Sequence, residues 1–276
     1  TMPARSLPAD SPPAPPASGM RDALRLQAEV VGALILRDTH IRFGRTRLGY
    51  LWVLIEPIAH AVGLSLVHYA LGRRSPLGGS MALFFMTGLL PFFLWSKVSS
   101  RLVSAFTSDR PLLNVPVVTH LDILIARALL EGATWLVVSS ILIALLVAIG
   151  FGPWPDDLGS LCGAIGALFL LAVGVGMINA TMSALLQSWH NVFGIVTRPL
   201  YLSSGIFYLV DQVPATAQRF LVWNPLVHGI EWVRMSFYPS YGAVTLDKAY
   251  LVQCAVVAFV LGLALERLGR RKAEAI

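Results

Sequence analysis

The sequence predicts an all-α integral membrane protein with six transmembrane helices, a cytoplasmic interfacial amphipathic helix at the N-terminus, and re-entrant helices between spans five and six. The 276 residues are 56% hydrophobic and only 13% charged, with a mean hydropathy of +0.69. Soluble domains carry about 25% charged residues. Six apolar runs are also long enough to cross the hydrocarbon core as helices, which takes roughly 20 residues.

These six runs define a transmembrane domain over residues 48–272. They cover residues 51–71, 81–106, 124–149, 158–186, 192–210 and 249–266. An even number of spans places both termini on one side of the membrane. Arginines crowd residues 21–47 and basic residues follow the sixth span, so both termini are expected in the cytoplasm, where positive flanks concentrate.

Arg73 and Arg74 do not fit this orientation, because the layout places them on the periplasmic side. Either the topology is wrong at this loop, or the pair has a function in the periplasm. Arg110, between spans two and three, fits the cytoplasmic side.

Two N-terminal segments precede the spans. Residues 1–20 are rich in Pro, Ala and Ser and are predicted to be a disordered tail. Residues 21–47 alternate apolar and charged side chains, which is typical of an amphipathic helix in the cytoplasmic interface. The apolar set is Leu24, Leu26, Val30, Val31, Leu34 and Ile35, and the charged set is Arg21, Arg25, Glu29, Arg37 and Asp38.

Two further segments are neither spans nor simple loops. Residues 107–122 carry two prolines and no long apolar run, which indicates a structured cytoplasmic link. Residues 201–240 are aromatic and broken by Pro214 and Pro225. Irregular backbone is tolerated at membrane depth only when protein buries it or when it lines a watery cavity, so short re-entrant helices entering from outside are expected.

Sequence motifs exclude several functions. The chain has no G-x-x-x-x-G-K-[ST] loop, no G-x-S-x-G and no H-E-x-x-H. Its six histidines have no ligand spacing, and Cys162 and Cys254 lie in apolar runs. We therefore predict no catalytic residues, no metal site and no bound cofactor, so any ATP and Mg²⁺ would be held by a partner chain.

Glu56 is the clearest charged group within a span, and His60 lies one turn later. Charged side chains inside spans are costly and face protein or water. Two interpretations stay open. The pair holds helices together, or it forms one wall of an aqueous path.

The stretch RFGRTRLGYLW places Arg42, Arg45 and Arg47 before the first span, followed by Tyr50 and Trp52. The arginines either anchor lipid phosphates or bind another anionic group at this entrance. Tyr50 and Trp52 lie about 200° apart on a helix, so both cannot face one channel.

Three stretches resemble membrane subunits of ATP-binding-cassette polysaccharide exporters, capsule exporters in particular. They are RDTHIRFGRTRLGYLWVLIEP (residues 37–57), RPLYLSSGIFY (198–208) and WNPLVHGIEWVRMSFYP (223–239). The first is the more specific, and the others are shared more loosely with O-antigen and teichoic acid exporters. The resemblance covers nearly the whole chain after residue 21.

The resemblance implies a bacterial inner-membrane permease that translocates a lipid-linked, usually anionic polysaccharide. In that case Arg42, Arg45 and Arg47 would capture or gate the lipid-linked substrate, as the alternative to anchoring lipid phosphates. The permease would form a homodimer, with two separate ATPase subunits, a periplasmic adaptor, an outer-membrane pore and no nucleic acid. Residues 109–120 would contain the coupling helix; the candidates within it are Asp109, Arg110, Pro111, Asn114, Pro116 and His120. Further channel candidates, besides Glu56 and His60, are Trp189, His190, Tyr201, Tyr208, Trp223 and Trp232.

Alternatives remain at this stage. A small-molecule or lipid exporter of the same fold would have a closed greasy pocket in place of an aromatic lining. A membrane-embedded glycosyl- or acyltransferase would need clustered acids or a catalytic histidine, for which only Glu56 with His60 is a candidate.

Overall fold

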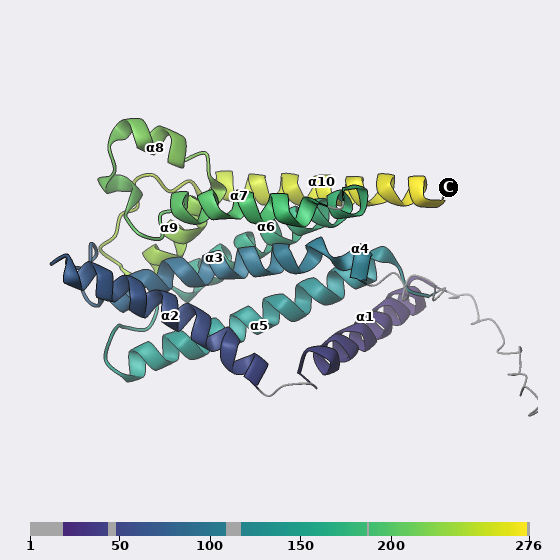
Figure 1. The fold of residues 1–276 in the computed structure, drawn as a ribbon, viewed down its shortest axis with the longest axis horizontal. Coiled ribbons are helices and arrows are strands. Elements are labelled where there is room, and N and C mark those ends of the chain that lie inside the picture. The colour runs from purple at the N-terminus through teal and green to yellow at the C-terminus, as the bar shows by residue number, and fades with distance from the viewer. Residues whose placement is uncertain (1–18, 44–47, 109–116, 187, 275–276) are drawn as a thin grey trace, which may run out of the picture.

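The computed structural model describes residues 19–43, 48–108, 117–186 and 188–274, and within these ranges the regular secondary structure is helical (Figure 1). The elements in chain order are α1 (Met20–Phe43), α2 (Leu48–Ala70), α3 (Met81–Val103), α4 (Ala105–Ser108), α5 (His120–Ala148), α6 (Leu158–Leu185), α7 (Trp189–Ser203), the 3₁₀ turn η2 (Val210–Gln212), α8 (Ala215–Leu221), α9 (Pro225–Phe237) and α10 (Lys248–Glu274).

Five helices in the described part of the chain are long and apolar enough to cross a membrane. They are Trp52–Ala70 within α2, Met81–Val103, His120–Ala148, Leu158–Leu185 and Lys248–Leu268 within α10. These correspond to the first, second, third, fourth and sixth predicted spans. The second is shorter than expected because the helix breaks at Ser104, before α4.

The fifth span, predicted near residues 192–210, is not confirmed as a helix of membrane length. The helix in this region, α7, has 15 residues and ends at Ser203, which gives a length of about 22 Å against roughly 30 Å of hydrocarbon. Gly205 follows with φ +76°, a left-handed conformation that stops a helix and that glycine adopts at little cost. The segment 201–240, predicted to be broken into short elements, contains η2, α8 and α9.

The long helices lie roughly alongside one another around α3 (Figure 1). Its apolar window is 83% buried, against 11% for that of α2, and α3 packs against α2, α5, α6 and α9. The helix α1 and the end of α10 lie at one end of the bundle, and α8 and α9 lie at the other (Figure 1). The chain reverses direction between successive long helices, as expected for a protein that crosses a membrane repeatedly.

Local sequence signals fix where several helices begin. The Thr119 hydroxyl accepts from the Asp122 backbone, and the Asp122 carboxylate accepts from the Thr119 backbone, which forms a capping box for α5. Asp157 caps α6 through Ser160, and Ser80 caps α3 through Leu83. Each side chain satisfies a backbone N–H that the first turn leaves without a helical partner.

Two glycines allow α6 and α10 to approach closely. A Cβ atom at Gly174 would lie 2.5 Å from the backbone nitrogen of Phe259, and one at Gly262 would lie 2.9 Å from the carbonyl oxygen of Gly174. Small residues at such contacts let two helix backbones pack directly in a membrane.

We expect Gly174→Val to destabilise the protein by about 3 kcal/mol, near the upper end of the cost of overpacking, because backbone atoms of α10 cannot move aside independently. Thermal unfolding in detergent measures this loss. Gly166→Val in the same helix is the control, since a Cβ there meets no atom within 4 Å. Equal melting temperatures for the two variants would contradict the account of the α6–α10 contact.

Candidate functional site: a polar band and an aromatic groove

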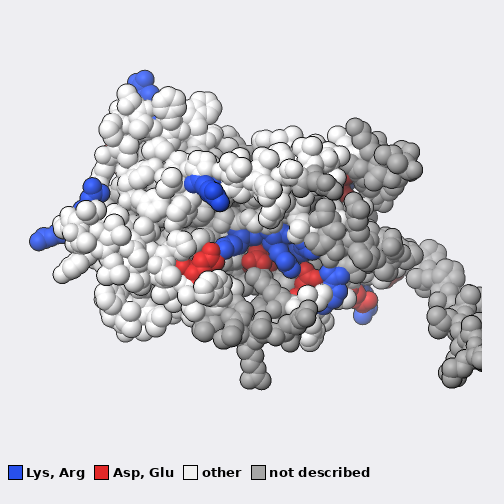
Figure 2. Space-filling view, viewed as in Figure 1, with Lys and Arg blue, Asp and Glu red and all other residues white. Residues whose placement is uncertain are grey.

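Charged side chains gather in one band across the middle of the face in Figure 2, and most of the remaining described surface of that face carries none. The band follows α2 and α3 toward α1, as comparison with Figure 1 makes clear. Two ion-pair groups make up this region, Glu56 with Lys97 and Asp38 with three arginines. We call them together the polar band.

Glu56 of α2 pairs with Lys97 of α3. The Lys97 Nζ lies 2.6 Å from Oε1 and 2.7 Å from Oε2 of Glu56. The same ammonium group lies 5.6 Å from the ring centroid of Phe93 and 5.8 Å from that of Trp135, within the range of cation–π attraction. The pair therefore joins α2 to α3 and α5.

His60 does not pair with the Glu56 carboxylate, contrary to the predicted polar pair. Its Nδ1 lies 2.8 Å from the Glu56 backbone oxygen, one helical turn back. Its ring faces the aromatic side chains of α3 and α7, at centroid distances of 5.5 Å to Phe93 and 6.4 Å to Tyr201. Glu56 thus holds helices together through Lys97, while the His60 side chain lines a different surface.

That surface is an open groove of about 440 Å³ between α2, α3 and α7, which we call the aromatic groove. It is lined by His60, Phe92, Phe93, Ser100, Gly194, Thr197, Arg198, Tyr201 and Leu202. The Phe92 and Tyr201 rings meet edge to face at 5.1 Å. Aromatic faces with an adjacent guanidinium can bind both the apolar face of a sugar ring and an acidic substituent.

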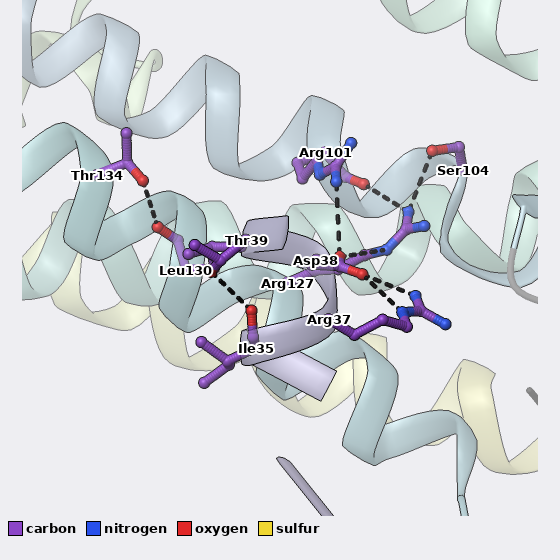
Figure 3. A network of polar contacts seen from close by, with 9 residues as sticks. All are labelled: Ile35, Arg37, Asp38, Thr39, Arg101, Ser104, Arg127, Leu130 and Thr134. Carbon is purple, nitrogen blue, oxygen red and sulfur yellow. Dashed lines mark hydrogen bonds and ion pairs between the residues drawn. The ribbon is translucent and has the colours of Figure 1, made fainter. Parts of the chain in front are cut away.

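Asp38 is the centre of the second ion-pair group (Figure 3). Its carboxylate accepts from Arg37 Nη2 at 2.7 Å, and lies 3.5 Å from Arg101 Nη2 and 3.9 Å from Arg127 Nε. Arg127 also donates to the Arg101 carbonyl and to Ser104, both at 3.2 Å. The cluster fastens α1 to α3 and α5.

The sequence analysis placed Asp38 on the charged face of the interfacial helix, but the structure buries its side chain. Its side chain is 8% exposed and Arg127 is 5% exposed, whereas the neighbouring Arg37 is 32% exposed. Within the apolar set of this helix, Val31 and Leu34 are buried in the protein, whereas Leu24 and Leu26 are exposed. The reason is that α1 packs on α5, and Asp38 faces that contact.

The sequence interpretation missed Lys97, Arg101 and Arg127. Lys97 and Arg101 lie four residues apart, so they share one face of α3. Their position in an otherwise apolar run was the available signal, because charges inside spans face protein or water. Their partners lie 41 to 89 residues away in the sequence, which no local pattern reveals.

The predicted channel residues do not lie together. His60 and Tyr201 share the aromatic groove. Trp189 donates to Asn179 of α6 at 3.0 Å, and Trp232 donates to Ser160 of α6 at 2.7 Å. His190 and Trp223 are exposed, and Tyr208 donates to the Leu202 carbonyl at 3.2 Å.

Most predicted entrance and coupling side chains lie outside the described part of the structure. These are Arg42, Arg45, Arg47 and Tyr50 at the entrance, and Asp109, Arg110, Pro111, Asn114 and Pro116 in the coupling segment. Trp52 is described and exposed, and His120 begins α5 with its ring 5.0 Å from that of Phe106. Arg73 and Arg74 are exposed in the loop between α2 and α3.

Arg234 anchors the region after α7. It is fully buried and donates to the carbonyl oxygens of Gly205, Ile206 and Tyr208 at 2.6, 2.9 and 3.2 Å. One turn before it, the Glu231 carboxylate accepts hydrogen bonds from the Thr245 hydroxyl at 2.9 Å and from the Tyr241 hydroxyl at 3.3 Å. These buried groups stabilise α9 and the turn, and they lie apart from the aromatic groove.

The described residues hold no group of three or more His, Cys, Asp or Glu side chains that could bind a metal ion. The polar band contains ion pairs, and the aromatic groove combines rings with one arginine. The ion pairs hold helices together, and the aromatic groove can bind a ligand.

The family described as ABC-2 type transporter matches residues 29–238, which run from α1 through α9. The chain belongs to this family of transporter membrane proteins. It is 34% identical over 248 residues to the polysialic acid transport protein KpsM of Escherichia coli, which covers 90% of this chain and 96% of KpsM.

Two other relatives carry similar names. The capsule polysaccharide export inner-membrane protein CtrC of Neisseria meningitidis is 29% identical over 88% of this chain and 92% of its own length. The capsule polysaccharide export inner-membrane protein BexB of Haemophilus influenzae is 26% identical over 89% of this chain and 92% of its own length. These relatives are named for transport and export, which agrees with the expectation that the chain is a transporter subunit and not an enzyme.

Proposed function

We propose that this chain is the inner-membrane permease of an ABC exporter for capsular polysaccharide. The observation that carries the proposal is the similarity to KpsM, CtrC and BexB over about nine-tenths of the chain. Membership in the ABC-2 type transporter family and the five apolar helices of membrane length in the described residues also support this proposal.

The aromatic groove gives this function a physical basis. The partly exposed ring of Tyr201, backed by the buried rings of Phe92 and Phe93, offers a contact for sugar rings, and the exposed Arg198 offers a fork for carboxylate or phosphate. An open groove makes such contacts one at a time and without strong sequence preference. A polymer can therefore pass along it.

The proposal includes six membrane crossings. The helix α7 leads back from the end of α6 toward α8 and α9 (Figure 1), so α7 with the short helices after it would supply the crossing that α7 is too short to make alone. In this arrangement α8 and α9 enter from the periplasm, both termini are cytoplasmic, and Arg73 and Arg74 face the periplasm.

The energy source is proposed to be a separate ATPase, which binds the ATP and Mg²⁺. Two permeases would pair with two such subunits, with residues 107–122 transmitting their motion. Motion of α1 would reach the spans by a second route, because the Asp38 cluster fastens α1 to α3 and α5. A periplasmic adaptor and an outer-membrane pore would receive the lipid-linked polymer.

A second polymer class has specific support. The O-antigen export system permease protein RfbA of Klebsiella pneumoniae is 23% identical over 82% of this chain. This match is weaker than those to the capsule relatives, so O-antigen or teichoic acid export is the alternative.

Complementation separates these possibilities. The chain is expressed with its own ATPase subunit in a strain that lacks its capsule permease, and surface polysaccharide is measured with capsule-specific and O-antigen-specific probes. We expect capsule to return to the surface. Restoration of O-antigen alone in the matching O-antigen-deficient strain would instead assign the chain to the alternative.

A further inference from the structure

A second pocket lies at the outer end of α2, away from the aromatic groove. It has a volume of about 330 Å³ and is lined by Ser65, Tyr69, Arg73, Arg74, Ser75, Gly78, Gly79 and Met81. We call it the α2–α3 loop pocket. It contains the two arginines that the positive-inside rule does not explain.

Two hydroxyl groups of this pocket are buried without a hydrogen-bond partner among the described residues, Ser65 Oγ and Ser75 Oγ. Leaving a buried hydroxyl unsatisfied costs about 1–3 kcal/mol. The buried helical serine Ser99 avoids this cost, since its hydroxyl donates to the Trp95 carbonyl one turn back at 2.7 Å. Two such hydroxyl groups in one pocket could donate hydrogen bonds to a ligand that carries acceptor oxygens.

The charge of the pocket is uncompensated within the described residues. Arg73 and Arg74 are exposed, and no described carboxylate forms an ion pair with either of them. The basic groups of the polar band, by contrast, each lie beside a carboxylate, Asp38 or Glu56. The pocket also reaches Met81, the first residue of α3, and the N-terminus of a long helix favours anions.

We propose that the α2–α3 loop pocket binds a carboxylate or phosphate group of the exported polysaccharide on the periplasmic side. Two guanidinium groups and two hydroxyl donors match the acceptor oxygens of such a group. Tyr69 is 83% exposed at the rim, where its ring can cover the face of the adjoining sugar. An aromatic face beside two arginines fits an acidic sugar better than a lipid headgroup. This inference rests on the proposed function.

The test uses the full chain with its ATPase subunit in nanodiscs of zwitterionic lipid. The probe is a short fluorescent oligosaccharide of carboxylated sugars, and its methyl ester is the uncharged comparison. We expect Arg73→Ala with Arg74→Ala to weaken binding about tenfold or more, as loss of charge-assisted hydrogen bonds predicts. Arg219→Ala is the matched control, an exposed arginine on α8 outside the pocket.

Ser75→Ala gives an independent readout, with an expected loss of about threefold for one neutral donor. The melting temperature of the double arginine variant is expected to match that of the wild type, because both arginines are exposed. Unchanged affinity in the double arginine variant would overturn the inference, and so would equal binding of the methyl ester. Binding of anionic phospholipid vesicles without binding of the oligosaccharide would also overturn it and assign the pocket to lipid.

Failure of this inference is distinguishable from failure of the proposed function. If the wild-type chain restores surface capsule but the double variant binds the oligosaccharide normally, export stands and the pocket does not take part. If the wild-type chain restores no surface polysaccharide, the proposed function itself fails.

Discussion

Asp38→Asn is expected to lower the free energy of unfolding by about 3–5 kcal/mol, the usual cost of removing one partner from a buried ion pair. The substitution takes away the carboxylate that Arg37, Arg101 and Arg127 share. Arg37 and Arg101 are about one-third exposed and water can solvate them, but Arg127 is 5% exposed. Most of the loss therefore comes from the buried guanidinium of Arg127.

The measurement is thermal or denaturant unfolding in detergent, with proteolysis of α1 as a local readout. Glu29→Gln is the control, because the Arg25–Glu29 pair lies on the same helix with side chains 83% and 65% exposed, and exposed pairs contribute about 0–1 kcal/mol. Adding Arg127→Met to Asp38→Asn should recover part of the lost stability. Equal stability of Asp38→Asn and Glu29→Gln would show that the cluster does not fasten α1.

Glu56→Lys is expected to detach α2 from α3 and to reduce export strongly. It places a second ammonium group opposite Lys97, where the wild-type atoms lie 2.6 Å apart. Both side chains are partly exposed, at 34% and 27%, so screening reduces the effect to about 2 kcal/mol, or about thirtyfold in an equilibrium constant. The helix has little else to hold it, because its apolar window is 11% buried.

The charge swap Glu56→Lys with Lys97→Glu is the matched control, because it restores an opposite pair across the same two helices. Export by the swapped variant should recover toward the wild-type level, and a double-mutant cycle then gives the pair's coupling energy. If the swap is as inactive as Glu56→Lys alone, the roles of the two residues depend on more than their mutual attraction.

The sequence predicted the parts of the fold that depend on long apolar runs. The five helices that reach membrane length agree with predicted spans, since burial in lipid needs about 20 apolar residues and little else. The fifth span is not confirmed as one helix, because α7 ends at Ser203 and the left-handed Gly205 follows it within the apolar run. A hydropathy pattern contains no information on such a turn.

The candidate site was only partly predictable. The sequence singled out His60, Tyr201 and Glu56 because polar or aromatic residues near membrane depth stand out locally, and the structure places them in the aromatic groove or the polar band. Asp38 follows Arg37 in the sequence and looks like part of a solvated face, but packing of α1 on α5 buries it. Ion pairs such as Lys97 with Glu56 depend on helix packing, which a single sequence does not specify.

Transport in a reconstituted system tests the central claim most directly. The chain and its ATPase subunit are placed in sealed vesicles with lipid-linked capsular polysaccharide, with the ATPase sites facing the medium, and polymer that has moved into the lumen is measured. The proposed function predicts ATP-dependent transport when both subunits are present, and neither ATP hydrolysis nor transport with this chain alone. ATP hydrolysis by this chain alone, or no polymer movement by the complete complex, would contradict it.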